Sequence, residues 1–147
     1  MNTILFPGSF NPFTKGHQSL VDRVIPLFDR VVIAIGVNSA KHTAAAVDSR
    51  IAAVSELYSN EPKVKVTSYE GLTVDACRRE GACWMLRGVR SVTDFEYERN
   101  LADINRRISG IETLLLFTLP EYAAISSSVV RELESYGHDV SEFLPSR

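Results

Sequence analysis

Short apolar runs alternate with amphipathic segments along the whole chain, and this alternation constrains the fold more than any other feature of the sequence. The runs are continuous in Val, Ile, Leu and Phe, which is typical of parallel strands buried on both faces. Five strands are expected, over Thr3–Phe6, Val31–Val37, Val64–Ser68, Cys83–Leu86 and Thr113–Thr118. The sequence therefore predicts a doubly wound α/β domain with a five-stranded parallel sheet.

Helical spacing occupies the segments between and after these runs. Helices are expected over Gln18–Phe28, Ser49–Ser59, Val74–Glu80, Asp94–Ile108 and Ser127–Tyr136. Asp48 and Thr73 are predicted N-caps, and Thr93 with Glu96 has the pattern of a capping box. Pro26 predicts that the first helix bends or ends early, because proline lacks the N–H that a helix interior needs.

The size and composition are those of one globular domain. The chain has 147 residues, of which 45% are hydrophobic and 23% charged, and no linker-like stretch divides it, so residues 1–147 are expected to form a single domain. A chain of this length buries about 68–70% of its unfolded surface and needs no disulfide or structural metal. Cys77 and Cys83 fit no zinc or redox spacing and are expected to be reduced thiols.

Charge and hydropathy exclude several classes of function. A formal net charge of −2 argues against a protein that coats nucleic acid or binds a membrane surface. The N-terminus lacks the pattern of a signal peptide, and no apolar run is long enough to span a bilayer. A cytoplasmic protein is therefore expected. His17, His42 and His138 have no metal-ligand spacing, so no metal site built by the protein is predicted.

The loop after the first expected strand has the composition of a phosphate-binding loop. Gly8 and Gly16 allow backbone N–H groups to approach a phosphate closely, and Ser9 and Thr14 add hydroxyl donors. His17 is expected near the electropositive start of the next helix, where its imidazole can donate to a phosphoryl oxygen. An ordinary turn with a helix-capping histidine also fits, and the spacing alone does not choose between the two. Neither the GxGxxG nor the GxxxxGK(S/T) pattern is present.

Four stretches carry a family resemblance. "PGSFNPFTKGH" resembles the (S/T)xGH signature of the nucleotidyltransferase superfamily, and "RGVRSVTDFEYE", "ISSSVVRE" and "DVSEFLP" follow it in the order typical of bacterial phosphopantetheine adenylyltransferases. The resemblance implies a Rossmann-like fold and transfer of the adenylyl group of ATP to 4'-phosphopantetheine, the penultimate step of coenzyme A synthesis. It also implies Mg²⁺ bound with ATP, feedback inhibition by coenzyme A, and a homohexamer. One departure is Asn11, where the family usually has an aspartate.

The same resemblance assigns the site residues. The implied catalytic residues are His17, Lys41, Arg90 and Ser128. The implied ATP contacts are Ser9, Phe10, His17, Gly88, Val89, Arg90, Glu98, Tyr122, Ala123, Ala124, Ile125, Ser126, Ser127 and Ser128, with Gly88 to Arg90 expected to form a turn. The implied contacts of phosphopantetheine are Ser9, Lys41, Leu72, Thr73, Arg87 and Asn105.

The chemistry of these residue types agrees with that assignment. A phosphate acceptor is already an oxyanion near neutral pH, so attack on phosphorus needs positioned donors rather than a general base or a covalent intermediate. Arginine grips phosphate with a planar fork, and hydroxyls at a helix start add donors. Taken singly, Lys41, Arg87, Arg90 and Glu98 could each be solvated surface side chains, and a serine before the last helix could be an N-cap.

Two other functions remain open at this stage. Another (S/T)xGH transferase would use nicotinamide mononucleotide or glycerol 3-phosphate as the acceptor, although the stretch from Arg87 to Glu98 argues against it. A regulator that binds a nucleotide or coenzyme A without turnover is the second alternative, and Asn11 is one of its few hints. Turnover of ATP distinguishes the regulator from either enzyme.

Overall fold

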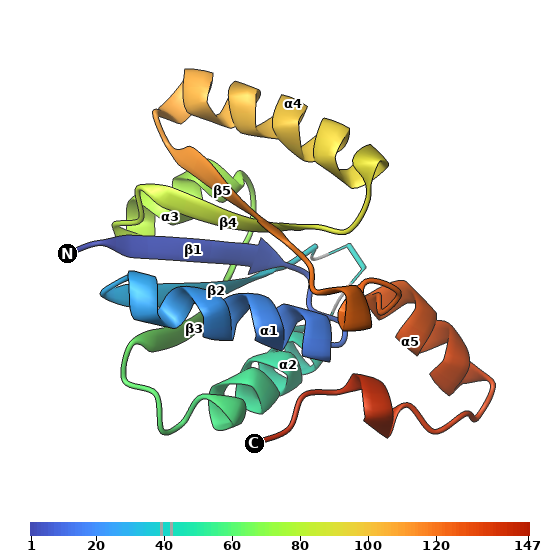
Figure 1. The fold of residues 1–147 in the computed structure, drawn as a ribbon. Coiled ribbons are helices and arrows are strands. Elements are labelled where there is room, and N and C mark those ends of the chain that lie inside the picture. The colour runs from blue at the N-terminus through green and yellow to red at the C-terminus, as the bar shows by residue number, and fades with distance from the viewer. Residues whose placement is uncertain (39, 42) are drawn as a thin grey trace.

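A five-stranded parallel sheet forms the centre of the computed structural model, which describes residues 1–38, 40–41 and 43–147. The strand order is β3-β2-β1-β4-β5, and every pairing between neighbours is parallel (Figure 1). The strands are β1 (Thr3–Gly8), β2 (Arg30–Gly36), β3 (Val64–Tyr69), β4 (Trp84–Val89) and β5 (Glu112–Phe117). The predicted fold class is confirmed, and all carboxyl ends of the strands meet at one edge.

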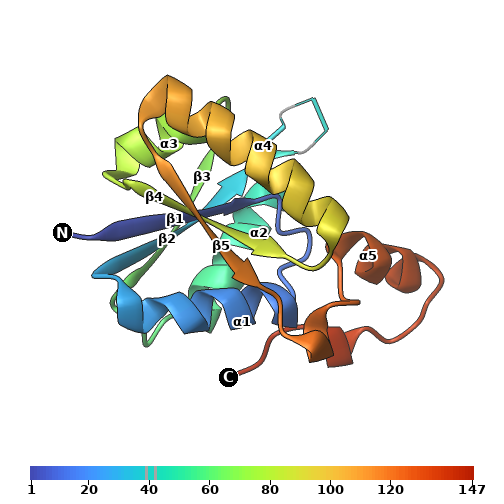
Figure 2. The ribbon, with the colours of Figure 1, turned by 45° about the horizontal axis from the view of Figure 1, so that its top comes forward.

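Helices cover both faces of the sheet. They are α1 (Lys15–Val24), α2 (Ala44–Leu57), α3 (Thr73–Glu80), α4 (Val92–Ser109) and α5 (Ser127–Ser135). Helices α1 and α2 lie on one face and α3 and α4 on the other, while α5 stands beyond the carboxyl edge (Figures 1 and 2). Pro26 ends α1 early, as predicted, because a 3₁₀ turn at Ile25–Leu27 replaces its last turn.

Two apolar clusters hold these layers together. Ile4 and Ile33 face α1 and α2, whereas their neighbours Leu5 and Val32 face α3, where Cys77 is fully buried. Successive strand residues point to opposite faces, so a strand covered on both sides must be apolar at every position. This is the physical reason that continuous apolar runs marked the strands correctly.

Several predicted helix starts are wrong. Thr43, not Asp48, caps α2, and Asp48 lies within the helix. The Oγ of Ser91 accepts from the backbone of the fourth helix, so Thr93 is inside α4 rather than at its cap. Thr73 is the first residue of α3 and shares a hydrogen bond with a tyrosine hydroxyl of β3 instead of capping. The course of the loop between each strand and the next helix determines which polar residue stands at the N-cap. That course cannot be read from the local sequence.

Within the described ranges, none of the helices combines the length and the apolar character that a membrane crossing requires.

Candidate active site

The loop that follows β1 at the carboxyl edge is closely packed. The backbone of Phe10 has a φ of 46°, in the left-handed region that side chains seldom adopt. A Cβ at Gly8 would lie 2.8 Å from the Phe10 ring, so only glycine fits against this ring without a shift. The loop therefore turns tightly just where β1 ends, and it leaves Ser9 exposed while the Phe10 ring packs into the core.

His17 is fixed at the start of α1 by a reciprocal cap. Its backbone N–H donates to the Oγ1 of Thr14, and its Nδ1 accepts from the backbone N–H of Thr14 at 3.0 Å. The rings of Phe10 and Phe13 lie 5.0 and 5.3 Å from the imidazole, centroid to centroid. Because Nδ1 accepts a hydrogen bond, the proton of the neutral ring belongs on Nε2. The capping role and the donor role are thus compatible, one on each nitrogen.

The electrostatic surroundings keep this imidazole neutral. Burial, then the positive charge of Arg90, then that of Arg87 lower the pKa of His17 to about 4. At neutral pH the ring is therefore an uncharged donor through Nε2. Its Nε2–H can donate a hydrogen bond and so stabilise developing negative charge. The neutral ring does not act as a general acid near neutral pH.

We expect this histidine to make stability depend on acid. Between its unfolded pKa of 6.5 and its folded pKa of about 4, the unfolded chain binds a proton that the folded chain excludes. The free energy of unfolding therefore falls as the pH decreases through this window, by up to about 3 kcal/mol, and this contribution is constant above pH 6.5. Urea unfolding at pH 7 and pH 4.5 measures it. His17→Asn should lose less stability than the wild type, and equal losses would contradict the assignment.

Arg87 and Glu98 form a two-point ion pair. Nε and NH2 of Arg87 donate to the two carboxylate oxygens of Glu98 at 2.9 and 2.7 Å. The third contact runs from NH1 to the carbonyl of Pro7 at 3.2 Å. The Glu98 side chain is only 7% exposed, so neither residue is the solvated surface charge that sequence alone allowed. The pair fixes the guanidinium of Arg87, a residue of β4, against the end of β1.

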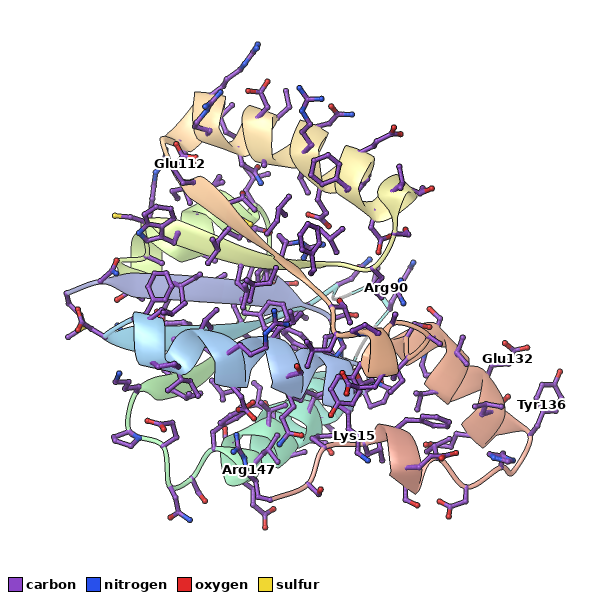
Figure 3. All side chains as sticks on the ribbon, viewed as in Figure 1. Lys15, Arg90, Glu112, Glu132, Tyr136 and Arg147 are labelled. Carbon is purple, nitrogen blue, oxygen red and sulfur yellow. The ribbon has the colours of Figure 1, made fainter. Side chains whose placement is uncertain are left out.

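Arg90 lies where the chain leaves β4. Its backbone N–H and Nε both donate to Oδ2 of Asp94, at 3.1 and 3.4 Å, and NH1 reaches the carbonyl of Ile125 at 3.5 Å. Figure 3 shows Arg90 between the end of the sheet and α5. The turn expected over Gly88 to Arg90 is wrong for its first two residues: Gly88 and Val89 are the last residues of β4, and the chain leaves the sheet at Arg90. Pairing with β5 extends the strand beyond its apolar run.

The three serines before and within α5 have different roles. Ser126 is the N-cap and accepts from the backbone N–H of Val129 at 3.2 Å. The hydroxyl of Ser127 donates to the carbonyl of Pro12 at 2.7 Å, which ties α5 to the phosphate loop. Ser128 is exposed and accepts from Arg131 at 3.4 Å. Capping therefore explains one serine, as the residue pattern suggested.

These elements enclose a cavity of about 410 Å³. The predicted residues that line it are Ser9, Phe10, His17, Arg87, Gly88, Arg90, Glu98, Tyr122, Ile125, Ser126 and Ser127. A second cavity of about 480 Å³ adjoins it, and its lining includes Ser9 and the predicted Lys41. Because Ser9 lines both cavities, the two meet at the loop that follows β1. The predicted residues that line neither are Val89, Ala123, Ala124, Ser128, Leu72, Thr73 and Asn105.

Asp94, Thr118 and Arg131 are among the lining residues that the sequence analysis did not single out. Asp94 follows Arg90 at a spacing of four residues, which favours an ion pair. This spacing could have indicated Asp94 as a neighbour of Arg90. Thr118 lies directly after β5 at the carboxyl edge, where ligands of open α/β sheets bind. Arg131 lines the second cavity one helical turn after Ser127, but no local signal distinguishes it from a surface arginine.

Among the residues that the structure describes, no three histidine, cysteine, aspartate or glutamate side chains gather around a common point. His42 lies outside the described residues. The absence of a metal site built by the protein therefore stays a prediction.

Fold and cavity together define an α/β protein with a cavity at the carboxyl edge of its sheet, lined by arginine, histidine and serine side chains. The sequence matches the cytidylyltransferase-like family over residues 5–133, so the chain belongs to this class of nucleotidyltransferases. It is 48% identical over 145 residues to a phosphopantetheine adenylyltransferase of Bacteroides fragilis, covering 99% of this chain and 97% of that one. A phosphopantetheine adenylyltransferase of Porphyromonas gingivalis is 51% identical, with 98% and 94% covered. The chain belongs to the phosphopantetheine adenylyltransferases, a family of nucleotidyltransferase enzymes.

Solved structures with low sequence identity share the fold. A protein of Vibrio parahaemolyticus that carries a provisional nicotinate-nucleotide adenylyltransferase assignment superimposes with a TM-score of 0.68 at 18% identity, over 99% of this chain and 95% of that one. At this identity the likeness concerns the fold alone.

Proposed function

We propose that the chain transfers the adenylyl group of ATP to the phosphate of 4'-phosphopantetheine and releases dephospho-coenzyme A and pyrophosphate. The observation that carries this proposal is the geometry of the first cavity. A neutral His17 donor, the Arg87 fork and the start of α5 converge there, beside a second cavity that reaches Lys41. Membership of the phosphopantetheine adenylyltransferases supports the choice of acceptor.

The proposed reaction is a direct displacement. A phosphate oxygen of the acceptor attacks the α-phosphorus of ATP, a new P–O bond forms, and the bond from that phosphorus to pyrophosphate breaks. The first cavity holds ATP, with Nε2–H of His17 and the guanidinium of Arg90 facing the phosphates. Both groups stabilise charge that increases on phosphoryl oxygens in the transition state. No proton has to be removed from the attacking oxygen, so the mechanism needs no general base.

The acceptor is placed at the junction of the two cavities. Its phosphate would contact Ser9 and Arg87, while Lys41 reaches the same region from the second cavity. Gly71 lines this second cavity and directly precedes Leu72 and Thr73, so the pantetheine arm would leave along that cavity toward them. Asn105 lies on α4, away from both cavities, and its contact with the arm rests on the family resemblance alone.

Glu98 is proposed to orient the acceptor site. It lines the ATP cavity, yet both of its oxygens are occupied by Arg87. A carboxylate held on both oxygens by one guanidinium fixes the orientation of that guanidinium, and burial of the Glu98 side chain limits the access of a further donor. Its effect on substrates would therefore act mainly through Arg87.

Mg²⁺ is proposed to arrive with ATP. The cavity offers the carboxylates of Asp94 and Glu98, and both are already paired with arginine. This donor set fits a cation held chiefly by phosphate oxygens and water, with few protein ligands. When bound, Mg²⁺ neutralises part of the charge on the leaving pyrophosphate.

Three wider properties are also proposals. Coenzyme A would inhibit by occupying the two joined cavities, since it shares the adenylyl and pantetheine parts of the substrates. A homohexamer would cover exposed apolar side chains on α4 and the end of β5, where Val92 is 77% and Phe117 is 75% exposed. Dependence on ATP and a role in coenzyme A synthesis favour the cytoplasm as the location.

The deciding experiment is pyrophosphate release from Mg-ATP with 4'-phosphopantetheine, beside nicotinamide mononucleotide and glycerol 3-phosphate. Release only with phosphopantetheine, together with dephospho-coenzyme A, is the expected result. Release with another acceptor would keep the mechanism and change the substrate. No release with any acceptor, while ATP still binds, would favour a regulator.

We expect Arg87→Ala to weaken phosphopantetheine more than ATP. Arg87 lines the first cavity together with Ser9, and the guanidinium N–H groups that Glu98 and Pro7 do not engage can still donate to a phosphate. Steady-state kinetics should show at least about a 10-fold rise in KM for phosphopantetheine, the loss of one charge-assisted contact, with a smaller change for ATP. Equal rises for both substrates would contradict the assignment.

A further inference from the structure

Side chains from other elements bind carbonyl oxygens at the end of β1 and in the loop that follows it. Arg87 donates to the carbonyl of Pro7, Ser127 to that of Pro12 and Arg131 to that of Asn11. These three donors line the proposed substrate cavities or lie directly beside them. Their contacts therefore belong to the site already described.

A fourth contact has a different origin. NH1 of Arg50 donates to the carbonyl of Ser9 at 2.8 Å, while its Nε is anchored on the carbonyl of Ala46 at 3.4 Å. Arg50 comes from the middle of α2 and lines neither substrate cavity. It lines a separate groove behind the loop, together with Phe10 and Phe13. Direct contact between Arg50 and a substrate is thus not part of this arrangement.

The direction of one peptide group follows from this contact. The peptide between Ser9 and Phe10 is trans, so its C=O and N–H point in opposite directions. Arg50 holds the C=O toward α2, so the N–H of Phe10 points away from that helix, and Ser9 and Phe10 both line the first substrate cavity. Among the described residues, none accepts a hydrogen bond from the backbone N–H of Ser9 or Phe10.

The backbone conformation of Phe10 needs stabilisation by contacts from outside the loop. Its φ of 46° is unfavourable for a residue with a side chain and persists only where the surroundings determine it. A charge-assisted hydrogen bond to the preceding carbonyl is such a support, since it is stronger than a bond between neutral groups. Without it, the peptide is free to rotate toward more favourable angles and to carry the N–H away from the cavity.

We propose that Arg50 is a positioning residue that holds the Ser9–Phe10 peptide with its N–H facing the phosphate groups of ATP. This inference rests on the proposed function and adds a backbone donor to it. The donor is preorganised, so it needs no rearrangement when charge increases on a phosphoryl oxygen. Its loss should therefore reduce kcat more than it reduces the affinity for ATP.

The test compares Arg50→Met and Arg50→Lys with a matched control, Arg78→Met. Arg78 also extends from a helix and donates to a carbonyl of another element, that of Ile108, far from both cavities. We expect Arg50→Met to lower kcat by about 10-fold or more, while the dissociation constant for ATP measured by calorimetry rises about 3-fold. Arg50→Lys should recover part of kcat, because its ammonium can still donate to the carbonyl.

The outcomes separate this inference from the proposed function. If Arg50→Met, like Arg78→Met, kept kcat within 2-fold of the wild-type value, the proposed role of Arg50 would be overturned. The role would also be overturned by a loss of kcat that only follows a lowered unfolding temperature, or by one that Arg50→Lys does not relieve at all. A wild type that releases no pyrophosphate with phosphopantetheine would overturn the function instead. In that case ATP affinity still tests the role of Arg50. Weaker ATP binding by Arg50→Met than by Arg78→Met would support the positioning role, and equal binding would contradict it.

Discussion

Replacing His17 with alanine is expected to lower kcat by about 10²-fold or more, the range typical of removing one transition-state donor. The ring is neutral, its Nδ1 is occupied by the backbone of Thr14, and its Nε2–H is left for the cavity. Because the interaction strengthens as charge develops, KM for ATP should change much less than kcat. Steady-state pyrophosphate release at saturating substrates measures this effect.

The control for this variant must separate the donor from the cap. His17→Asn keeps a side-chain acceptor near the backbone N–H of Thr14 but is too short to extend a donor as far as Nε2 does. It should therefore retain more stability than His17→Ala and lose as much kcat. Near-normal turnover in both variants would remove His17 from the mechanism. Low turnover in the alanine variant alone would assign the histidine a purely structural role.

The second large effect is expected at Glu98. Glu98→Gln should lower the free energy of unfolding by about 3 kcal/mol, because Arg87 would keep a half-buried positive charge without its partner. Urea unfolding near pH 7 measures this difference. Asp103→Asn on the same helix breaks the exposed pairs with Arg106 and Arg107, and it should cost less than about 1 kcal/mol.

A double variant shows whether the pair acts as a unit. Arg87→Met with Glu98→Leu removes both charges and fills the space with apolar atoms, so most of the stability lost in Glu98→Gln should return. Phosphopantetheine turnover should not return with it, since Arg87 is absent. If the double variant were less stable than Glu98→Gln alone, an uncompensated charge would not be the cause of the loss.

Sequence predicted the strands better than the helix starts. The runs in β1 and β2 are apolar at successive positions, and burial on both faces requires this at every residue. Helix starts depend on which polar side chain the connection delivers to the N-cap, so Thr43 and Ser91 replaced the expected residues. The end of β4 was also missed, because Gly88 and Val89 become strand only by pairing with β5.

The candidate site was predicted in part. Motif residues at the ends of β1 and β4 and the start of α5 do line one cavity, since parallel strands deliver their carboxyl ends to the same edge. Lys41 lies in the adjoining cavity. Leu72, Thr73 and Asn105 line neither, and their roles in binding the pantetheine arm stay predictions.

The sequence by itself determined the fold class, the family and the set of cationic and hydroxyl side chains, because hydrophobic periodicity and motif residues are local properties of the chain. Only the tertiary structure decided how these groups are oriented. It engaged Nδ1 of His17 in the helix cap while placing the same residue in the cavity lining, and it brought Arg50 and Arg131 to carbonyls that lie 41 and 120 positions away in the chain. The direction of a peptide N–H depends on the donor that holds the C=O of the same peptide. When that donor is far away in the sequence, the residues around the peptide do not indicate it.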